Sequence, residues 1–317
     1  MSAIAVLLAA VLAGPVQDAP VQNSVRQDSQ AVAQLEDVVV ESRRLDELVS
    51  DFVSEAAVPA RGRGLARWRG NICPGIVNLQ SEAAQYIADR LSQVALDLGL
   101  IPGEPGCRAN IIIVFTVDGA GLTARLADED RSAFRSRAGG MERGNVAFAE
   151  FVESRQPVKW WHISMPTDAE TGQRAIRLPG EVNNFGVPAA PEIRVFAASR
   201  LNTQIRDDMK KVMVIVDVDE IGQASLAQLA DYIAFVSLAQ VDPDADISAY
   251  DTVLKLFDQP ATAPEGLTDW DRSYLTSLYE ALDAPQFRRN PSAVSSGVAD
   301  TMTRERRAAR DGSTDED

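Results

Sequence analysis

A single histidine, His162, limits the chemistry available to this 317-residue chain. Histidine is the usual general base at neutral pH, and zinc sites normally draw on several histidine or cysteine ligands. The chain has one histidine and two cysteines, and it contains no HExxH, GxSxG, GxxxxGKS/T or GxGxxG motif. We therefore expect no metal and no other cofactor, and we favour a non-catalytic protein over an enzyme.

The histidine lies in an aromatic strand, Val158–Met165 (VKWWHISM). Alternation along a strand places Trp160 and His162 on one face and Trp161 on the other. One interpretation is a lone base beside aromatic rings in a binding cleft. The other, which we favour, is a half-buried histidine that is hydrogen-bonded beside packed tryptophans. Trp160, Trp161 and His162 are the first candidate binding residues.

Four carboxylates stand at the ends of two apolar runs, Asn110–Asp118 and Lys211–Asp219, that predict buried strands. Ligand sites in α/β folds commonly lie at such strand ends. Two carboxylates there could act as acid and base, as in glycoside hydrolysis, so a carboxylate-dependent hydrolase is the alternative function. Helix capping or simple solvent exposure is the more common role for such side chains. The candidates are Asp118, Asp217, Asp219 and Glu220.

Arginines surround a tryptophan in the segment Arg61–Gly70 (RGRGLARWRG), although the chain as a whole is acidic. They could contact an anion or polyanion. Alternatively, the segment is a solvated loop whose arginines pair with nearby acids, and this is the interpretation we favour. Arg67, Trp68 and Arg69 remain candidate binding residues.

The N-terminal segment Met1–Gly14 (MSAIAVLLAAVLAG) is apolar, and a polar segment with prolines follows it. The apolar run is too short to span a bilayer but has the length of a signal-peptide core. No lysine or arginine precedes the run, so a buried N-terminal helix is the alternative. We expect a signal peptide at residues 1–14, a disordered linker at 15–36, and a periplasmic or secreted product with no membrane span after cleavage.

Cys73 and Cys107 are the two cysteines of the chain. Export would place them in an oxidising compartment, where two thiols usually pair, so we expect a disulfide between them. The competing hypothesis is a cysteine enzyme in which one of these thiols is the nucleophile and His162 is the base.

The net charge restricts the partners. The formal charge is −15 and the isoelectric point is about 4.6. Such a balance repels a phosphate backbone, so we expect no nucleic-acid binding. The partner classes that remain are an envelope protein and a small ligand.

The order of the elements predicts an α+β (mixed α/β) fold, in which a central sheet of about five strands is flanked by helices in a single domain. That domain is expected over residues 37–284. The polar segment 285–317 predicts a disordered tail. Further strands are expected at Asp37–Glu41 and Arg174–Leu178, and the main helices at Ser81–Leu98, Ala120–Asp128, Ser225–Gln240 and Thr268–Leu282.

Four segments resemble an uncharacterised family of exported alphaproteobacterial proteins: LARWRGNICPGIVNL, SEAAQYIADRL, GEPGCRANIIIVFTVD and LADYIAFVSLAQVDPD. The likeness covers roughly Val38 to Ala281. Both cysteines lie within these segments, which supports their pairing. The family has no assigned activity, so the resemblance implies export and leaves the function open.

A second likeness concerns Gln228–Gln240 followed by LTDWDRSYLTSLYEA. This layout is similar to an exported family of unknown function that is related to zinc peptidases. In that family the helix carries metal-binding residues, whereas the helix here has no histidine. The likeness therefore implies a zincin-like fold that has lost its metal site.

Together these observations favour an exported, non-catalytic protein that binds an envelope component or a small ligand. The carboxylate-dependent hydrolase, the zincin-like fold without metal and the cysteine enzyme are the alternatives.

Overall fold

A computed structural model describes residues 44–60, 62–130, 134, 142–176, 205–281 and 294–313. The chain divides into two units, Met1–Arg44 and Leu45–Asp317, and the sheet and its helices belong to the second. The expected signal peptide and linker lie outside the described residues. Every helix in the described part of the chain is too short or too polar to cross a bilayer.

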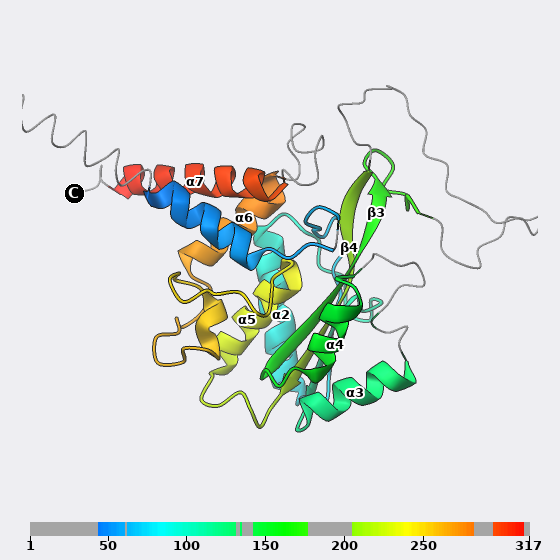
Figure 1. Ribbon diagram of the computed structural model, residues 1–317. Coiled ribbons are helices and arrows are strands. Elements are labelled where there is room, and N and C mark those ends of the chain that lie inside the picture. The colour runs from blue at the N-terminus through cyan, green and yellow to red at the C-terminus, as the bar shows by residue number, and fades with distance from the viewer. Residues whose placement is uncertain are drawn as a thin grey trace, which may run out of the picture. The chain divides into compact units, whose positions relative to one another are not determined.

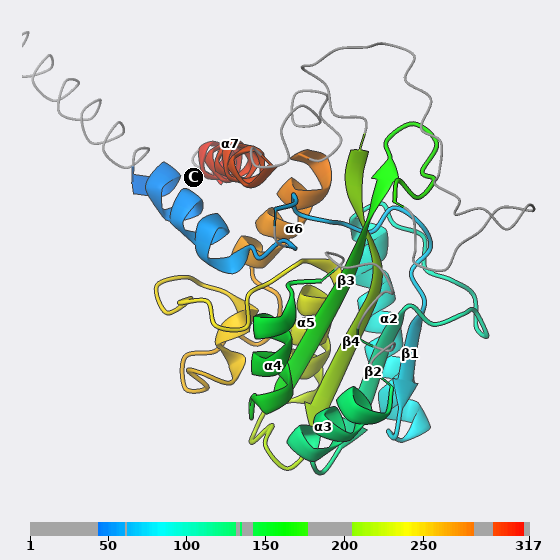
Figure 2. The ribbon, with the colours of Figure 1, turned by 45° about the vertical axis from the view of Figure 1, so that its right-hand side comes forward.

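One mixed sheet organises the described residues, with four strands in the spatial order β1-β2-β4-β3. Strands β1, β2 and β4 are parallel neighbours, and β3 pairs antiparallel with β4 at the edge of the sheet (Figure 2). The outer parts of β3 and β4 continue as a ribbon beyond a register shift at Ile163 and Ser164. The bounds are Pro74–Val77 for β1, Ile111–Thr116 for β2, Val158–Asp168 for β3 and Ile205–Asp217 for β4.

Helices cover both faces of the sheet (Figures 1 and 2). Helices α2 and α5 pack on one face and form the larger core, which the helix of residues 44–56, α6 and α7 extend. Helices α3 and α4 lie on the opposite face, over the smaller core around Trp161. The bounds are Ser81–Asp97 for α2, Gly119–Glu129 for α3, Asn145–Glu153 for α4, Leu226–Leu238 for α5, Asp269–Ala281 for α6 and Val294–Ser313 for α7.

The mixed α/β class predicted from the sequence is confirmed, but the sheet has four strands and not five. In its described part, the expected strand Arg174–Leu178 makes one bridge, between Arg174 and Thr167. The expected strand Asp37–Glu41 lies outside the described residues. Strand β1 was not among the expected strands, because it is only four residues long and begins with proline and glycine.

The helices with strong apolar periodicity are found where the sequence predicts them, as α2, α3, α5 and α6. The segment 285–317 differs from the expected disordered tail, because it contains α7. Val294, Val298 and Met302 recur every four residues, are buried in the larger core, and lie on a helix that packs against α6. The polar composition of this segment hides a narrow apolar stripe.

The expected disulfide between Cys73 and Cys107 is present, with the two Cα atoms 6.1 Å apart. Cys73 directly precedes β1, and Cys107 lies in the loop before β2. The bond therefore closes a loop that contains β1 and α2.

Replacing both cysteines (Cys73→Ser with Cys107→Ser) should lower the free energy of unfolding by about 3–4 kcal/mol, because the cross-link no longer restricts the unfolded chain. Urea unfolding measures this difference. Reduced wild-type protein is the matched control and should unfold at the same urea concentration as the double variant. A wild-type stability that is insensitive to reduction would contradict this account.

Candidate functional site

The carboxyl ends of the neighbouring strands β2 and β4 lie side by side. From these two ends the chain continues to opposite faces of the sheet. Strand β2 leads into α3, which lies over the smaller core, and β4 leads into α5, which lies over the larger core. Such switch points are the usual ligand sites of open α/β sheets. Two of the predicted carboxylates, Asp118 and Asp217, lie at this point.

Both carboxylates accept backbone hydrogen bonds at the start of α3. Asp118 caps the helix by accepting from the N–H of Gly121 at 2.7 Å, and Asp217 accepts from the N–H of Gly119 at 2.7 Å. A Cβ at position 119 would lie 3.1 Å from the Asp217 Cβ, so glycine permits this close approach. The anion-binding end of α3 is thus occupied by the protein's own carboxylate.

The other two predicted carboxylates, Asp219 and Glu220, lie in the turn after β4 and are exposed. The structure therefore brings two of the four carboxylates, Asp118 and Asp217, to the start of α3, although the Asp118 side chain is itself exposed.

A lysine that the sequence analysis did not single out lies near these two carboxylates. Lys159 pairs across the strands with Ile215, two residues before Asp217 on the same face of the sheet. Its side chain is 2% exposed, and Nζ donates to the carbonyl of Ser154 at 3.0 Å. Burial lowers the pKa of Lys159 to about 8, although the charges of Asp118 and Asp217 oppose that shift.

A pocket with a cavity volume of about 50 Å³ lies against β3, between α4 and the loop Val241–Asp244. Strand β3 lines it with the consecutive residues 159–162, which include the candidates Trp160, Trp161 and His162. The remaining lining includes Ala147 and Glu150 of α4, together with Arg143, Gln156 and Asp244.

Two polar contacts join the walls of this pocket. A nitrogen of Arg143 lies 3.1 Å from Asp242, and Gln156 donates from Nε2 to the carbonyl of Pro243 at 2.9 Å. Arg143 reaches the pocket from just before α4, where Gly144 has a φ of 101°, a value that favours glycine. The pocket is therefore a narrow slot. Arg143, before α4, and Gln156, before β3, each make one polar contact to the loop Val241–Asp244 on the other side of the slot.

His162 is neutral in this environment. Its Nε2 lies 2.7 Å from the carbonyl of Val236, which can only accept a hydrogen bond. Nε2 therefore carries the proton and Nδ1 is unprotonated. Burial lowers the pKa of His162 to about 4, against the raising effect of that hydrogen bond. The side chain is 8% exposed and lies beside two tryptophans that donate from Nε1 to the carbonyls of Val241 and Phe134.

The other candidate group, Arg67 to Arg69, lies along the outer part of β4 and does not line the pocket. The carbonyl of Arg67 accepts from the N–H of Met209 at 2.8 Å, and Trp68 donates from Nε1 to the carbonyl of Ser237 at 2.8 Å. Arg67 and Trp68 are both buried. These contacts attach the segment to β4 as if it were a short additional strand.

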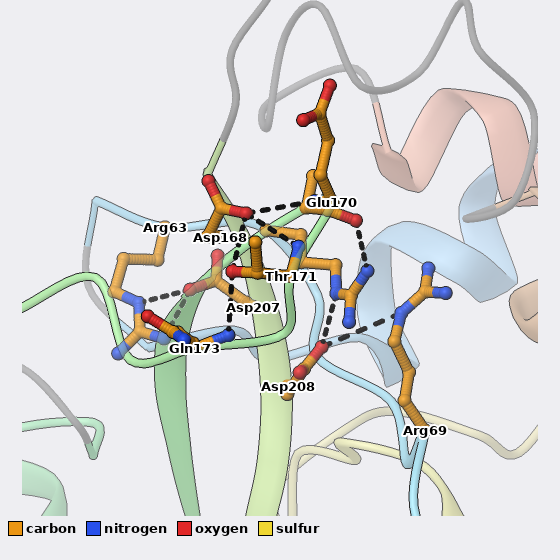
Figure 3. Close-up of polar contacts among 10 residues, drawn as sticks. Arg63, Arg69, Asp168, Glu170, Thr171, Gln173, Asp207 and Asp208 are labelled. Carbon is orange, nitrogen blue, oxygen red and sulfur yellow. Dashed lines mark hydrogen bonds and ion pairs between the residues drawn. The ribbon is translucent and has the colours of Figure 1, made fainter. Parts of the chain in front are cut away.

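Acidic side chains of β4 face the arginines of this segment (Figure 3). Arg63 pairs with Asp207, whose second oxygen accepts from the N–H of Gly64 at 3.1 Å. Asp208 lies 3.5 Å from Arg69 and 3.0 Å from Arg206. The pairing between arginines and acids that the sequence analysis favoured is thus present at Arg63 and Arg69, but the segment is not the solvated loop that was expected, because residues 64–68 are buried against the sheet.

Fold and site together define a mixed α/β protein with a small, partly polar pocket at the edge strand of its sheet. Comparisons with protein-family models, with curated proteins and with solved structures found no match. Among the described side chains, no three or more histidines, cysteines, aspartates or glutamates gather where they could hold a metal ion.

Sequence reasoning missed the cationic and amide groups of the pocket. Lys159 carries a signal, since it is a charged residue inside an otherwise largely apolar strand. Arg143 and Gln156 flank α4, a helix that the sequence analysis did not predict.

Stability should fall as the pH is lowered from about 6.5 toward 4, because the buried imidazole of His162 accepts a proton less readily than it does in the unfolded chain. The contribution of the neutral His162 side chain to the free energy of unfolding is fully present above pH 6.5. It decreases by about 3 kcal/mol as the pH falls to 4. The control is His162→Gln, which can keep a donor toward Val236 but does not titrate. Urea unfolding at several pH values isolates the histidine as the difference between the two proteins, and an identical pH dependence would contradict the prediction.

Asp217→Asn should lower the free energy of unfolding by about 1–3 kcal/mol, because it removes the negative charge that faces the Gly119 N–H and the buried Lys159. Asp219→Asn is the matched control, since it alters an exposed neighbour, and should change stability by less than about 0.5 kcal/mol. Equal effects of the two changes would show that Asp217 has no special role in holding β4 to α3.

Proposed function

We propose that the protein is an exported, non-catalytic binding protein whose ligand enters the pocket beside β3. The observation that carries the proposal is the composition of that pocket: two tryptophans, a neutral histidine, and the cations Lys159 and Arg143 around about 50 Å³. Aromatic rings combined with a few polar groups are typical of ligand sites. The ligand is an envelope protein or a small molecule that places one small group in the cavity.

Export is supported by two independent features. The apolar segment Met1–Gly14 has the length of a signal-peptide core, and the Cys73–Cys107 disulfide is of the kind that persists in oxidising compartments.

The state of the carboxylates supports binding rather than hydrolysis. A general acid or base must direct its proton or lone pair at the substrate. Asp118 and Asp217 instead accept backbone N–H groups of α3, and neither lines the pocket. His162 lines the pocket, but its one proton is donated to the carbonyl of Val236, so this histidine cannot serve as a general acid there.

A photoreactive amino acid at Asp244, on the exposed rim of the pocket, should form a crosslinked adduct with the ligand in cells that export the protein. Ala147→Leu fills the pocket from α4 and should reduce this adduct at least tenfold. Ala149→Leu is the matched control, because it adds the same side chain to an exposed position of α4 outside the pocket lining, and it should leave the adduct unchanged.

Mass spectrometry measures the adduct, and urea unfolding confirms that both leucine variants are folded. An adduct of equal intensity in all three proteins, or none in any, would argue against a ligand in this pocket.

A further inference from the structure

The free edge of β3 carries unpaired backbone groups at the pocket. Pro157 accepts from the N–H of Asp217, and backbone groups along an antiparallel strand point alternately toward and away from the partner. The N–H and C=O groups of Val158, Trp160 and His162 therefore point away from β4. Throughout the described ranges, these outward groups have no hydrogen-bond partner.

The outer part of the same edge shows how such groups are satisfied. Pro166 accepts from the N–H of Ala175 at 2.8 Å, and Asp168 donates to the carbonyl of Gln173 at 2.7 Å. An antiparallel bridge forms between these two bonds, at Thr167. The edge of β3 thus pairs with an extended segment along its outer part and is open along its inner part.

The pocket lies on the open part. Consecutive residues of a strand direct their side chains to opposite faces of the sheet. Residues 159–162 nevertheless all line this one pocket, so the pocket must lie at the edge of β3, where both faces can be reached. Trp160 is 5% exposed and His162 is 8% exposed, so the unpaired groups lie in a site with little access to solvent. Buried backbone groups without partners are unfavourable, and a ligand that supplied those partners would gain affinity.

We propose that this pocket receives an extended segment of a partner polypeptide, one residue of which exchanges both backbone hydrogen bonds with Trp160. The proposal rests on the proposed function and names its ligand. Main-chain pairing of this kind recognises a peptide by its backbone, while the adjoining pocket selects the side chain.

The volume of the pocket specifies that side chain. In this measure one water occupies about 10–15 Å³, so about 50 Å³ holds roughly four waters. That space fits a glycine or alanine residue and excludes larger ones. The contact between Arg143 and Asp242 joins the walls across the slot, and since each side chain is about a quarter exposed, an incoming segment can displace it at little cost.

The test uses the full, disulfide-bonded protein, labelled with ¹⁵N, and two probes. The first probe is N-acetyl-trialanine amide at millimolar concentration, and the second is the same peptide with its central nitrogen methylated, which cannot form the pair. We expect the first peptide to slow hydrogen exchange of the Trp160 amide at least tenfold and the methylated peptide to leave it unchanged. Ala147→Leu should abolish the effect, and Ala149→Leu should retain it.

The outcomes separate this inference from the proposed function. Equal protection by both peptides would overturn strand pairing. Protection by neither peptide, together with a crosslinked adduct that Ala147→Leu removes, would also overturn it and would leave a binding pocket for a ligand that is not a polypeptide. Protection by neither peptide, with no pocket-dependent adduct, would remove both proposals.

Discussion

Strand β4 must have its backbone groups paired within the protein, and the described structure is arranged around that requirement. Residues 212–216 of β4 are buried between the two cores, so their N–H and C=O groups cannot bond to water. Strands β2 and β3 supply the partners on either side. Farther out, beyond the first residue of β2, the segment around Arg67 continues the pairing at Asp208.

Charge accompanies this pairing at both ends of β4. At the outer end, Asp207 and Asp208 hold the arginine-rich segment against the strand through Arg63 and Arg69. At the inner end, Asp217 binds the first turn of α3 and lies on the same face as Lys159. Residues that suggest an anion site and an acid–base pair when read along the sequence therefore make contacts that hold elements of the fold together. Backbone groups without a hydrogen-bond partner in the described residues lie instead along the inner part of the edge strand β3.

Much of the fold was predictable, because local periodicity reports burial. The apolar stripes of α2 and α5 and the apolar run of β2 were sufficient to place these elements. Elements with weak local signals were missed: β1 is short and begins with Pro74, and α7 buries only a narrow stripe beneath a charged surface. Both elements are stabilised mainly by tertiary packing against the rest of the protein. A local sequence pattern does not report such packing, so it could not predict β1 or α7.

The site was less predictable for a related reason. The sequence indicated that Trp160, Trp161 and His162 are unusual, but the pocket also depends on Arg143 and on the loop Val241–Asp244, which are distant from these residues in sequence. The open edge of β3 is a property of the sheet order, because it arises where no further described strand follows β3. The sequence of β3 alone therefore does not predict this open edge.

The disulfide has a topological consequence. Cys73 precedes β1 and Cys107 precedes β2, so the bond joins the entrances of two parallel neighbours whose connecting helix is α2. This strand–helix–strand unit is a covalent ring. A protease that cuts the chain once anywhere inside the ring therefore leaves one covalently joined molecule, and the two fragments separate only after the disulfide is also reduced.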